Sequence, residues 1–313
     1  MSFKDYIKEN LPWIRSIYRK RFAPINLIHN IFDKPVVVLL YHRVNYLNRD
    51  LFNINVTPDN FERHIRILKN HYNVITFNDL KRNDIKEPSV IITFDDGYYD
   101  NYKYAFPILK KYQVPATIFI TSGGVDTGKE FWWDRLETVL FENKNLRESI
   151  ELDILNQRHV FDVSDDKKRL HSFYTLHHML FSLHPNERDM ILDRWYESYG
   201  LKVNPNNRTM TSSELIDLYE SNLITLGAHT IHHPALKQIS REEQIHEIQS
   251  SKLFLENLLH MDIDIFAYPF GHKESFDQVT EQIVQDLGFT YSVSTKRAQL
   301  HSNTNPFSIP RFG

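Results

Sequence analysis

Short apolar runs alternate with helix-like stretches along most of the chain from Pro35 onward. The apolar runs are rich in Val, Ile, Phe and Thr, which is typical of buried strands. They occupy residues 36–40, 74–77, 89–94, 116–120, 223–229, 263–269 and 289–295. This alternation predicts an α/β fold of parallel strands joined by crossover helices. In such folds the functional groups lie at the carboxyl ends of the strands.

Helix-start signals separate several of these runs. Thr57 followed by Pro58 marks the beginning of one helix, and residues 102–112 have the spacing of another. Capping-box spacing marks two more helix starts, at Thr211 with Glu214 and at Ser240 with Glu243.

The stretch from about residue 125 to residue 208 breaks this rhythm. It is rich in charged residues and in helical spacing, and its one strand-like stretch is residues 148–155. We interpret it as a mostly helical insertion over one rim of the fold. The tandem His177-His178 lies in this insertion without a nearby carboxylate motif, so we interpret the pair as structural.

Residues 1–34 form an N-terminal segment with an amphipathic pattern. Apolar residues repeat at helical spacing, with Lys and Arg around them. Such a helix either packs on the body of the protein, the interpretation we favour, or makes a peripheral membrane contact. No apolar run reaches the roughly 20 residues of a membrane span, and charges interrupt the place where a signal peptide has its apolar core. These features favour a cytoplasmic location, with the membrane surface as the alternative.

The amino-acid composition argues against nucleic-acid binding and excludes any site that needs cysteine. The 313 residues carry a formal net charge of −3, so no basic field indicates nucleic-acid binding. The chain has no cysteine, which excludes disulfides and thiolate metal sites. A metal ion would therefore have to be held by His, Asp and Glu side chains. The length suits two domains or one large barrel with insertions.

Two adjacent carboxylates, Asp95 and Asp96, come directly after the apolar run 89–94 and before Gly97. Paired carboxylates at the end of a buried strand are costly unless a cation or a proton compensates them. An ordinary turn is the alternative, because Asp and Gly favour turns. Alone, this motif is weak evidence for a site.

Two histidines, His229 and His233, follow the run 223–229 and are four residues apart. In a single helical turn both imidazoles could face one metal ion. Solvated or hydrogen-bonded histidines are the alternative. A pair at ligand spacing beside a strand end favours the metal.

A third strand end, residues 266–271, runs into a Pro/Gly loop, so three motifs gather at successive strand ends. One carboxylate and two histidines leave coordination positions open, as a catalytic metal requires. The second carboxylate is then free to act as a base.

These motifs resemble those of the polysaccharide deacetylase family, which shares the NodB homology domain and is carbohydrate esterase family 4. The family's motifs TFDDG, H-[ST]-x-x-H-P and YP-G match residues 93–97, 229–234 and 266–271. Residues 41–44 and 56–69 resemble the poly-N-acetylglucosamine deacetylase branch. The resemblance covers roughly residues 35–125 and 210–313. It implies a distorted (β/α) barrel over residues 35–313, interrupted by the insertion.

The resemblance also implies roles for individual residues. Asp96, His229 and His233 would bind a divalent metal ion, most plausibly Zn²⁺, with Co²⁺ or Ni²⁺ as alternatives. Asp95 would be the general base that deprotonates the attacking water. The Tyr268 backbone N–H would help to hold the oxyanion. Thr230 would support the ligand loop.

Two departures from the family pattern direct attention to other residues. Ala267 stands where many members have an Arg that orients the base, and Arg311 is the candidate replacement. The usual C-terminal Leu-x-His motif is not evident. His42, in the N-terminal YH block, is therefore the favoured general acid, with His301 as its rival.

The function that we expect is metal-dependent hydrolysis of N-acetyl groups on N-acetylhexosamine residues of a surface polysaccharide, an oligosaccharide or a lipid-linked precursor. Removal of formyl or another small acyl group from a sugar amine is a close alternative. A non-haem Fe(II) oxygenase would also use two histidines and a carboxylate, but the β/α alternation argues against that class. A sugar-binding module would not need the intact Asp and His set. Trp132 or Trp133 could stack on a sugar or belong to the core.

Overall fold

The computed structural model describes residues 35–82, 85, 87–154 and 157–313. The amphipathic segment 1–34, and with it the proposed membrane contact, lies outside the described residues. None of the helices within the described ranges is long and apolar enough to cross a membrane.

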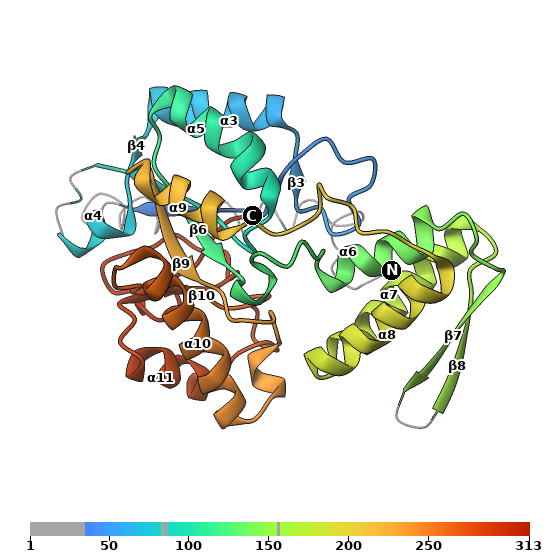
Figure 1. Ribbon diagram of the computed structural model, residues 1–313. Coiled ribbons are helices and arrows are strands. Elements are labelled where there is room, and N and C mark those ends of the chain that lie inside the picture. The colour runs from blue at the N-terminus through green and yellow to red at the C-terminus, as the bar shows by residue number, and fades with distance from the viewer. Residues whose placement is uncertain (1–34, 83–84, 86, 155–156) are drawn as a thin grey trace, which may run out of the picture.

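A parallel sheet forms the centre of the fold, with the strand order β1-β5-β6-β9-β10-β11 (Figure 1). A short strand, β4, pairs with the beginning of β5. The strands are β1 (Val36–Tyr41), β4 (Asn73–Val74), β5 (Ser89–Phe94), β6 (Ala116–Ile120), β9 (Ile224–Ala228), β10 (Ile265–Ala267) and β11 (Tyr291–Val293). Every residue of β5 and β6 is buried, as expected for central strands covered on both faces. The α/β fold class is confirmed.

The segment that carries Arg311 closes the curled sheet. Ile309 bridges Val293 of β11 in parallel, and Phe312 bridges Leu39 of β1 in parallel. The Leu40 N–H donates to the Phe312 carbonyl at 2.7 Å. One segment therefore connects the two edge strands, which gives the distorted barrel that the resemblance implied.

Helices cover the barrel, and side-chain caps fix where they begin. Thr57 caps α3 (Pro58–His71), and Thr211 and Ser240 form the expected capping boxes of α9 (Ser212–Glu220) and α10 (Arg241–Leu259). The helix expected over residues 102–112 is present, but its first part is a π-helix, η1 (Asn101–Ala105), before α5 (Phe106–Tyr112). In Figure 1, α3 and α5 lie above the sheet and α10 lies below it, beside α11 (Gln278–Asp286).

The strand expected over residues 74–77 was only partly right. Pairing ends at Val74 because Thr76 and Asp79 form a capping box that begins α4 (Phe77–Lys81).

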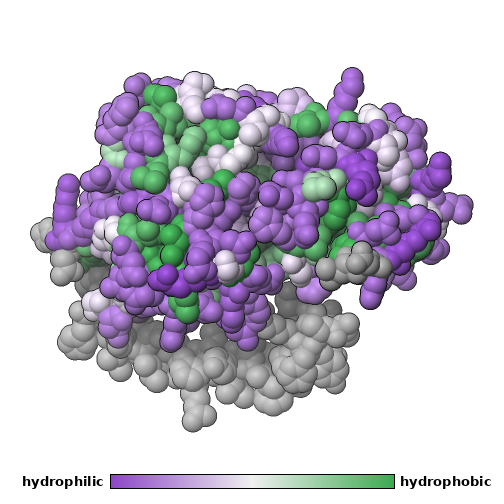
Figure 2. Space-filling view, turned by 60° about the horizontal axis from the view of Figure 1, so that its bottom comes forward, coloured by the Kyte–Doolittle hydropathy of each residue, from purple (hydrophilic) through white to green (hydrophobic). Residues whose placement is uncertain are grey.

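The insertion between β6 and β9 forms a lobe at the right of Figure 1. Its main elements are α6 (Trp132–Glu137), the π-helix η3 (Thr138–Glu142), β7 (Ser149–Ile154), β8 (Gln157–Asp162), α7 (Asp166–Phe181) and α8 (Pro185–Tyr199). It is mostly helical, and its strand-like stretch is one arm of an antiparallel hairpin, β7-β8. Its core is a separate apolar cluster that includes Trp133, Phe173 and Trp195. The face of the molecule shown in Figure 2 is largely hydrophilic, with separate apolar patches.

Candidate active site

The adjacent carboxylates lie where β5 ends, and both are 3% exposed. The Asp95 N–H still continues the sheet, donating to the Tyr41 carbonyl at 3.0 Å. At Asp96 the backbone turns sharply, with φ of 74°, and Gly97 follows at 81°. A positive φ is costly for Asp, so the surrounding structure must hold this turn. The turn sends the two neighbouring carboxylates to different partners.

Asp96 lies between the two predicted histidine ligands. Its Oδ1 is 3.4 Å from Nε2 of His229 and 3.4 Å from Nε2 of His233. Nδ1 of His229 is 2.7 Å from the Ala267 carbonyl oxygen, to which it must donate, so in the neutral ring Nε2 has the free lone pair that a metal ion needs. Ligand atoms on bonds of about 2.1 Å around a tetrahedral ion lie about 3.4 Å apart. The donor set therefore fits a divalent metal ion such as Zn²⁺.

The histidine pair lies in a loop after β9 and not in the helical turn that its spacing suggested. Thr230 and His233 both have positive φ, 65° and 53°. The Thr230 hydroxyl accepts from the His233 N–H at 3.1 Å and donates to the His229 carbonyl at 2.6 Å. Thr230 thus holds the loop in the shape that turns both imidazoles toward Asp96.

Asp95 pairs with Arg311 on the segment that closes the barrel. The two guanidinium NH₂ groups lie 2.7 and 2.6 Å from the two carboxylate oxygens, a bidentate ion pair, and Arg311 is 1% exposed. Nε donates to the Ser294 carbonyl, and Nη1 also reaches the Thr93 hydroxyl. The contact expected between Arg311 and Asp95 is confirmed.

These contacts determine the charge states of both carboxyl groups. Burial by itself would raise the pKa of Asp95, but the charge and hydrogen bonds of Arg311, together with the nearby histidines, outweigh it and hold the pKa below its usual value. Burial also opposes ionisation of Asp96, and the two histidines beside it lower its pKa more strongly. Both groups are therefore carboxylates at neutral pH, as a base and a metal ligand must be.

A cavity of about 400 Å³ opens over these residues. Its lining includes Asp95, Asp96, His229, His233 and His42. His42 follows β1, and the Asn101 amide holds its backbone carbonyl at 2.8 Å. His301 lies elsewhere, in a second cavity with Val36 at the amino end of β1. The structure therefore places His42, but not His301, in the same cavity as the two carboxylates and the two predicted histidine ligands.

The insertion and three loops cover the cavity, and most of their lining side chains are apolar or aromatic. The additional lining residues are Phe52, Ile54, Trp133, His177, Phe270, His272 and Thr295. His177, which we interpreted as structural, packs on Trp132 and also lines the cavity. Burial lowers the pKa of His177 to about 4, so the ring is neutral near pH 7. Trp133 also lines the cavity, whereas Trp132 stacks on His177 at 4.6 Å.

The geometry contradicts the role predicted for Tyr268. Its backbone N–H already donates to the Val293 carbonyl at 3.2 Å, continuing the pairing of β10 with β11. Its side chain is fully buried and donates to the Phe307 carbonyl. Phe270, two residues later, lines the cavity, and its N–H has no protein acceptor among the described residues. It is the better candidate for an oxyanion donor.

Comparison with known proteins shows that this site lies within a region shared with a known family. The model of a family described as polysaccharide deacetylase matches residues 82–145 and 190–292, just over half of the chain. The chain belongs to the polysaccharide deacetylase family. The matched ranges contain the Asp95-Asp96 pair, both histidines and the β10 strand end.

This polysaccharide deacetylase has relatives among curated proteins and solved structures. It is 25% identical to the poly-β-1,6-N-acetyl-D-glucosamine N-deacetylase of Staphylococcus aureus (strain MRSA252) over 296 residues, 89% of this chain and 78% of that protein. It superposes on IcaB from Ammonifex degensii with a TM-score of 0.58 at 18% identity, covering 88% of this chain and 90% of that one. The Streptococcus pyogenes deacetylase PplD, solved in complex with acetate, gives 0.57 at 19% identity, with coverages of 89% and 92%. These two structures support the fold.

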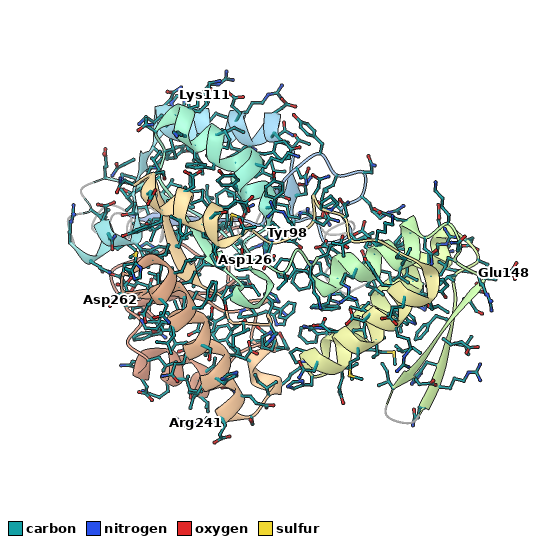
Figure 3. All side chains as sticks on the ribbon, in the orientation of Figure 1. Tyr98, Lys111, Asp126, Glu148, Arg241 and Asp262 are labelled. Carbon is teal, nitrogen blue, oxygen red and sulfur yellow. The ribbon has the colours of Figure 1, made fainter. Side chains whose placement is uncertain are left out.

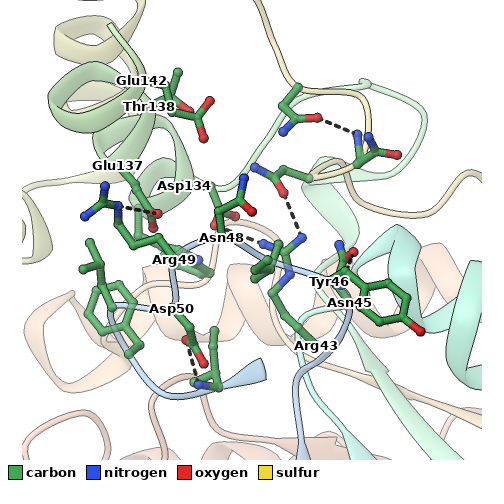
Figure 4. Close-up of a pocket in the computed structure, with 18 of the residues that line it drawn as sticks. Arg43, Asn45, Tyr46, Asn48, Arg49, Asp50, Asp134, Glu137, Thr138 and Glu142 are labelled. Carbon is green, nitrogen blue, oxygen red and sulfur yellow. Dashed lines mark hydrogen bonds and ion pairs between the residues drawn. The ribbon is translucent and has the colours of Figure 1, made fainter. Parts of the chain in front are cut away.

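A buried polar network beside the cavity was not expected from the sequence. Arg43 donates through Nε to Asp100 at 2.8 Å and lies 3.4 Å from Asp134. The Tyr98 hydroxyl donates to the other Asp134 oxygen and accepts from the Trp133 indole N–H. The network joins the His42 loop to the insertion, and Figure 4 shows Arg43 and Asp134 within it. Its members are far apart in the chain, so spacing gave no signal.

Proposed function

We propose that this polysaccharide deacetylase removes N-acetyl groups from N-acetylhexosamine residues of a glycan, using a divalent metal ion held by Asp96, His229 and His233. One observation carries the proposal: three metal-ligand side chains meet at the floor of a cavity, next to a carboxylate that an Arg holds in place. A metal ion at this position would polarise the acyl carbonyl and acidify a bound water. Zn²⁺ suits the nitrogen and oxygen ligands best, with Co²⁺ or Ni²⁺ as alternatives.

The chain's own residues would move the protons. Asp95 is ionised and oriented by Arg311, so it can take a proton from the attacking water. His42, on the wall of the same cavity, would donate a proton to the leaving amine. The Phe270 N–H would stabilise the negative charge that develops on the acyl oxygen.

The cavity lining favours acetyl over formyl. Phe52, Ile54, Trp133 and Phe270 provide apolar surface around the ligand cluster. A methyl group buried there would contribute about 0.8 kcal/mol that a formyl group lacks. The named substrate of the Staphylococcus aureus relative makes a β-1,6-linked N-acetylglucosamine polymer the first candidate glycan. A cytoplasmic location, with membrane contact through residues 1–34, stays a proposal.

Mass spectrometry of β-1,6-linked N-acetylglucosamine oligosaccharides, before and after incubation with the metal-loaded enzyme, tests the proposal. Each turnover should replace one acetyl group by hydrogen, a net loss of C₂H₂O from the glycan, and release one acetate. The Asp95→Asn variant and chelated enzyme are the controls. Unchanged masses across acetylated glycans, or turnover of formyl amides alone, would overturn it.

A further inference from the structure

A second cleft, larger than the catalytic cavity, lies between the loop after β2 (Arg43–Val44) and the insertion. Its volume is about 650 Å³, within the range of roughly 300–1,000 Å³ for small-molecule sites. Figure 4 shows Asn48 and Arg49 of the loop on the side of Asp134 and Glu137 of α6, whereas the Asp50 carboxylate turns back to its own loop, where the Ile54 and Asn55 N–H groups donate to it. We call it the polar cleft.

The polar cleft adjoins the catalytic cavity. Phe52, Ile54 and Trp133 line both spaces. The Trp133 indole N–H is held by the Tyr98 hydroxyl at 2.6 Å, so this shared wall is fixed. A glycan with one sugar over the metal ligands would have an adjacent sugar within reach of the polar cleft.

The lining of the polar cleft suits a sugar. Five side-chain amides and the aromatic rings of Tyr104 and Trp133 contribute to it. Amides both donate and accept hydrogen bonds, as sugar hydroxyls require, and aromatic rings pack on the apolar faces of sugar rings. The amides are Asn45, Asn48, Asn204, Asn206 and Asn207.

The charges of the polar cleft favour a cationic group. Arg43 pairs with Asp100 and also lies 3.4 Å from Asp134, and the Ile54 and Asn55 N–H groups hold Asp50. Arg49 and Lys103 are the other cations in a lining that contains four carboxylates. Arg49 reaches Glu137 only at 3.9 Å. Glu142 is exposed to the cleft and has no ion-pair partner among the described residues. The four carboxylates are those of Asp50, Asp134, Glu137 and Glu142.

The raised pKa values of Asp134 and Glu137 also favour a cationic group in the polar cleft. Burial raises the pKa of Asp134 to about 7 and that of Glu137 to about 7. Glu142 and Asp50 add to the effect at Glu137 by repulsion between like charges. An ammonium group placed there would relieve this repulsion and stabilise the ionised forms.

We propose that the polar cleft is a subsite for a glucosamine residue, a sugar that carries a free ammonium group, next to the N-acetylated sugar in the catalytic cavity. The proposal rests on the proposed function, because that reaction makes this amine. Glu137 and Glu142 would hold the ammonium group. The amides of Asn48, Asn204 and Asn206 would hold the hydroxyls, because those of Asn45 and Asn207 are already bonded within the protein. The product of one deacetylation would then strengthen binding for the next on the same chain.

Calorimetric binding to metal-free, full-length protein tests this inference without turnover. Two β-1,6-linked oligosaccharides of equal length are compared, one fully N-acetylated and one containing a single glucosamine. We expect the glucosamine-containing ligand to bind about tenfold more tightly at low salt, a difference that salt should reduce. The Glu137→Gln, Glu142→Gln double variant should bind the two ligands equally.

The controls separate this inference from the proposed function. Glu148→Gln removes an exposed carboxylate that lies at the outer end of the insertion in Figure 3 and does not line the polar cleft, and it should keep the preference. Glu142→Gln alone changes an exposed side chain and should reduce the preference without a folding defect. Equal affinity of wild-type protein for both ligands, or a preference that persists in the double variant, overturns the subsite. Failure to release acetate counts against the proposed function alone.

Discussion

Arg311 and Asp95 are 216 positions apart in the chain and form a buried, bidentate ion pair. Asp96, the next residue, pairs instead with the two histidines. The position where many family members carry an Arg is Ala267, which contributes its carbonyl oxygen to orient His229. The positive charge beside the base therefore comes from the barrel-closing segment and not from the β10 strand end.

Replacing Arg311 should slow turnover and leave metal binding intact. Arg311→Ala removes the group that orients Asp95, and we expect a fall in kcat of about 10²-fold or more, with metal content by mass spectrometry near normal. Arg311→Lys should recover little activity, since Lys lacks the planar fork that matches a carboxylate. Normal turnover in Arg311→Ala would remove Arg311 from the mechanism.

The same variant should also be less stable. Removing one partner of a buried ion pair costs about 3–5 kcal/mol, because the other charge stays buried without compensation. Denaturant unfolding of Arg311→Ala should show this loss in the free energy of unfolding. The double variant Arg311→Ala, Asp95→Asn should recover part of it.

The two adjacent aspartates should differ in what they control. Asp95→Asn should keep its metal and lose about 10²–10⁴-fold in kcat, the usual effect of losing a general base. Asp96→Asn should lower metal occupancy itself, since Oδ1 of Asp96 faces both imidazoles. Metal content and kcat, measured on the same samples, separate the two roles. Equal metal loss in both variants would contradict this division.

Removing the metal should abolish activity. Chelation should reduce acetate release to background, and Zn²⁺ or Co²⁺ should restore it. His229→Ala and His233→Ala should each lose most of the bound metal, because two remaining side chains rarely hold it. Full activity in verified metal-free protein is the result that would count against this site.

His42 and His301 offer a matched pair of variants. His42→Ala should lower kcat by about 10²–10⁴-fold, because His42 lines the catalytic cavity and is the proposed general acid. His301→Ala should stay within a few-fold of wild type, since His301 lies at the amino end of β1. The opposite ranking would exchange the two assignments.

Local patterns predicted much of the fold. The buried strands β5 and β6 are continuous apolar runs, and the caps at Thr57, Thr211 and Ser240 mark real helix starts. Prediction failed where a helix-start signal overlapped an apolar run, and where a strand had no apolar pattern. The Thr76 capping box cut one strand short, and the hairpin strand β8 is too polar and exposed to show an apolar face.

The site residues that directly follow a strand were predictable from the sequence. Residues whose position or hydrogen bonding depends on the local backbone conformation were less predictable. Asp95, Asp96, His229 and His233 meet as expected. The helical turn for the histidines was wrong, because positive φ values at Thr230 and His233 cannot be read from spacing. Tyr268 was misassigned because its N–H partner lies on another strand. His177 reaches the cavity only through the packing of the insertion.

The barrel-closing segment gives the enzyme a built-in order of assembly. Asp95 leaves the ribosome well before Arg311, and at about 5–20 residues per second the interval is about 10–40 s. Until then, a carboxylate destined for the interior has no counter-charge, so the growing chain gains little by burying it. Closure of the sheet and neutralisation of the base therefore become one late, long-range event. A nascent chain that has formed most of its strands therefore still lacks the residue that orients its base.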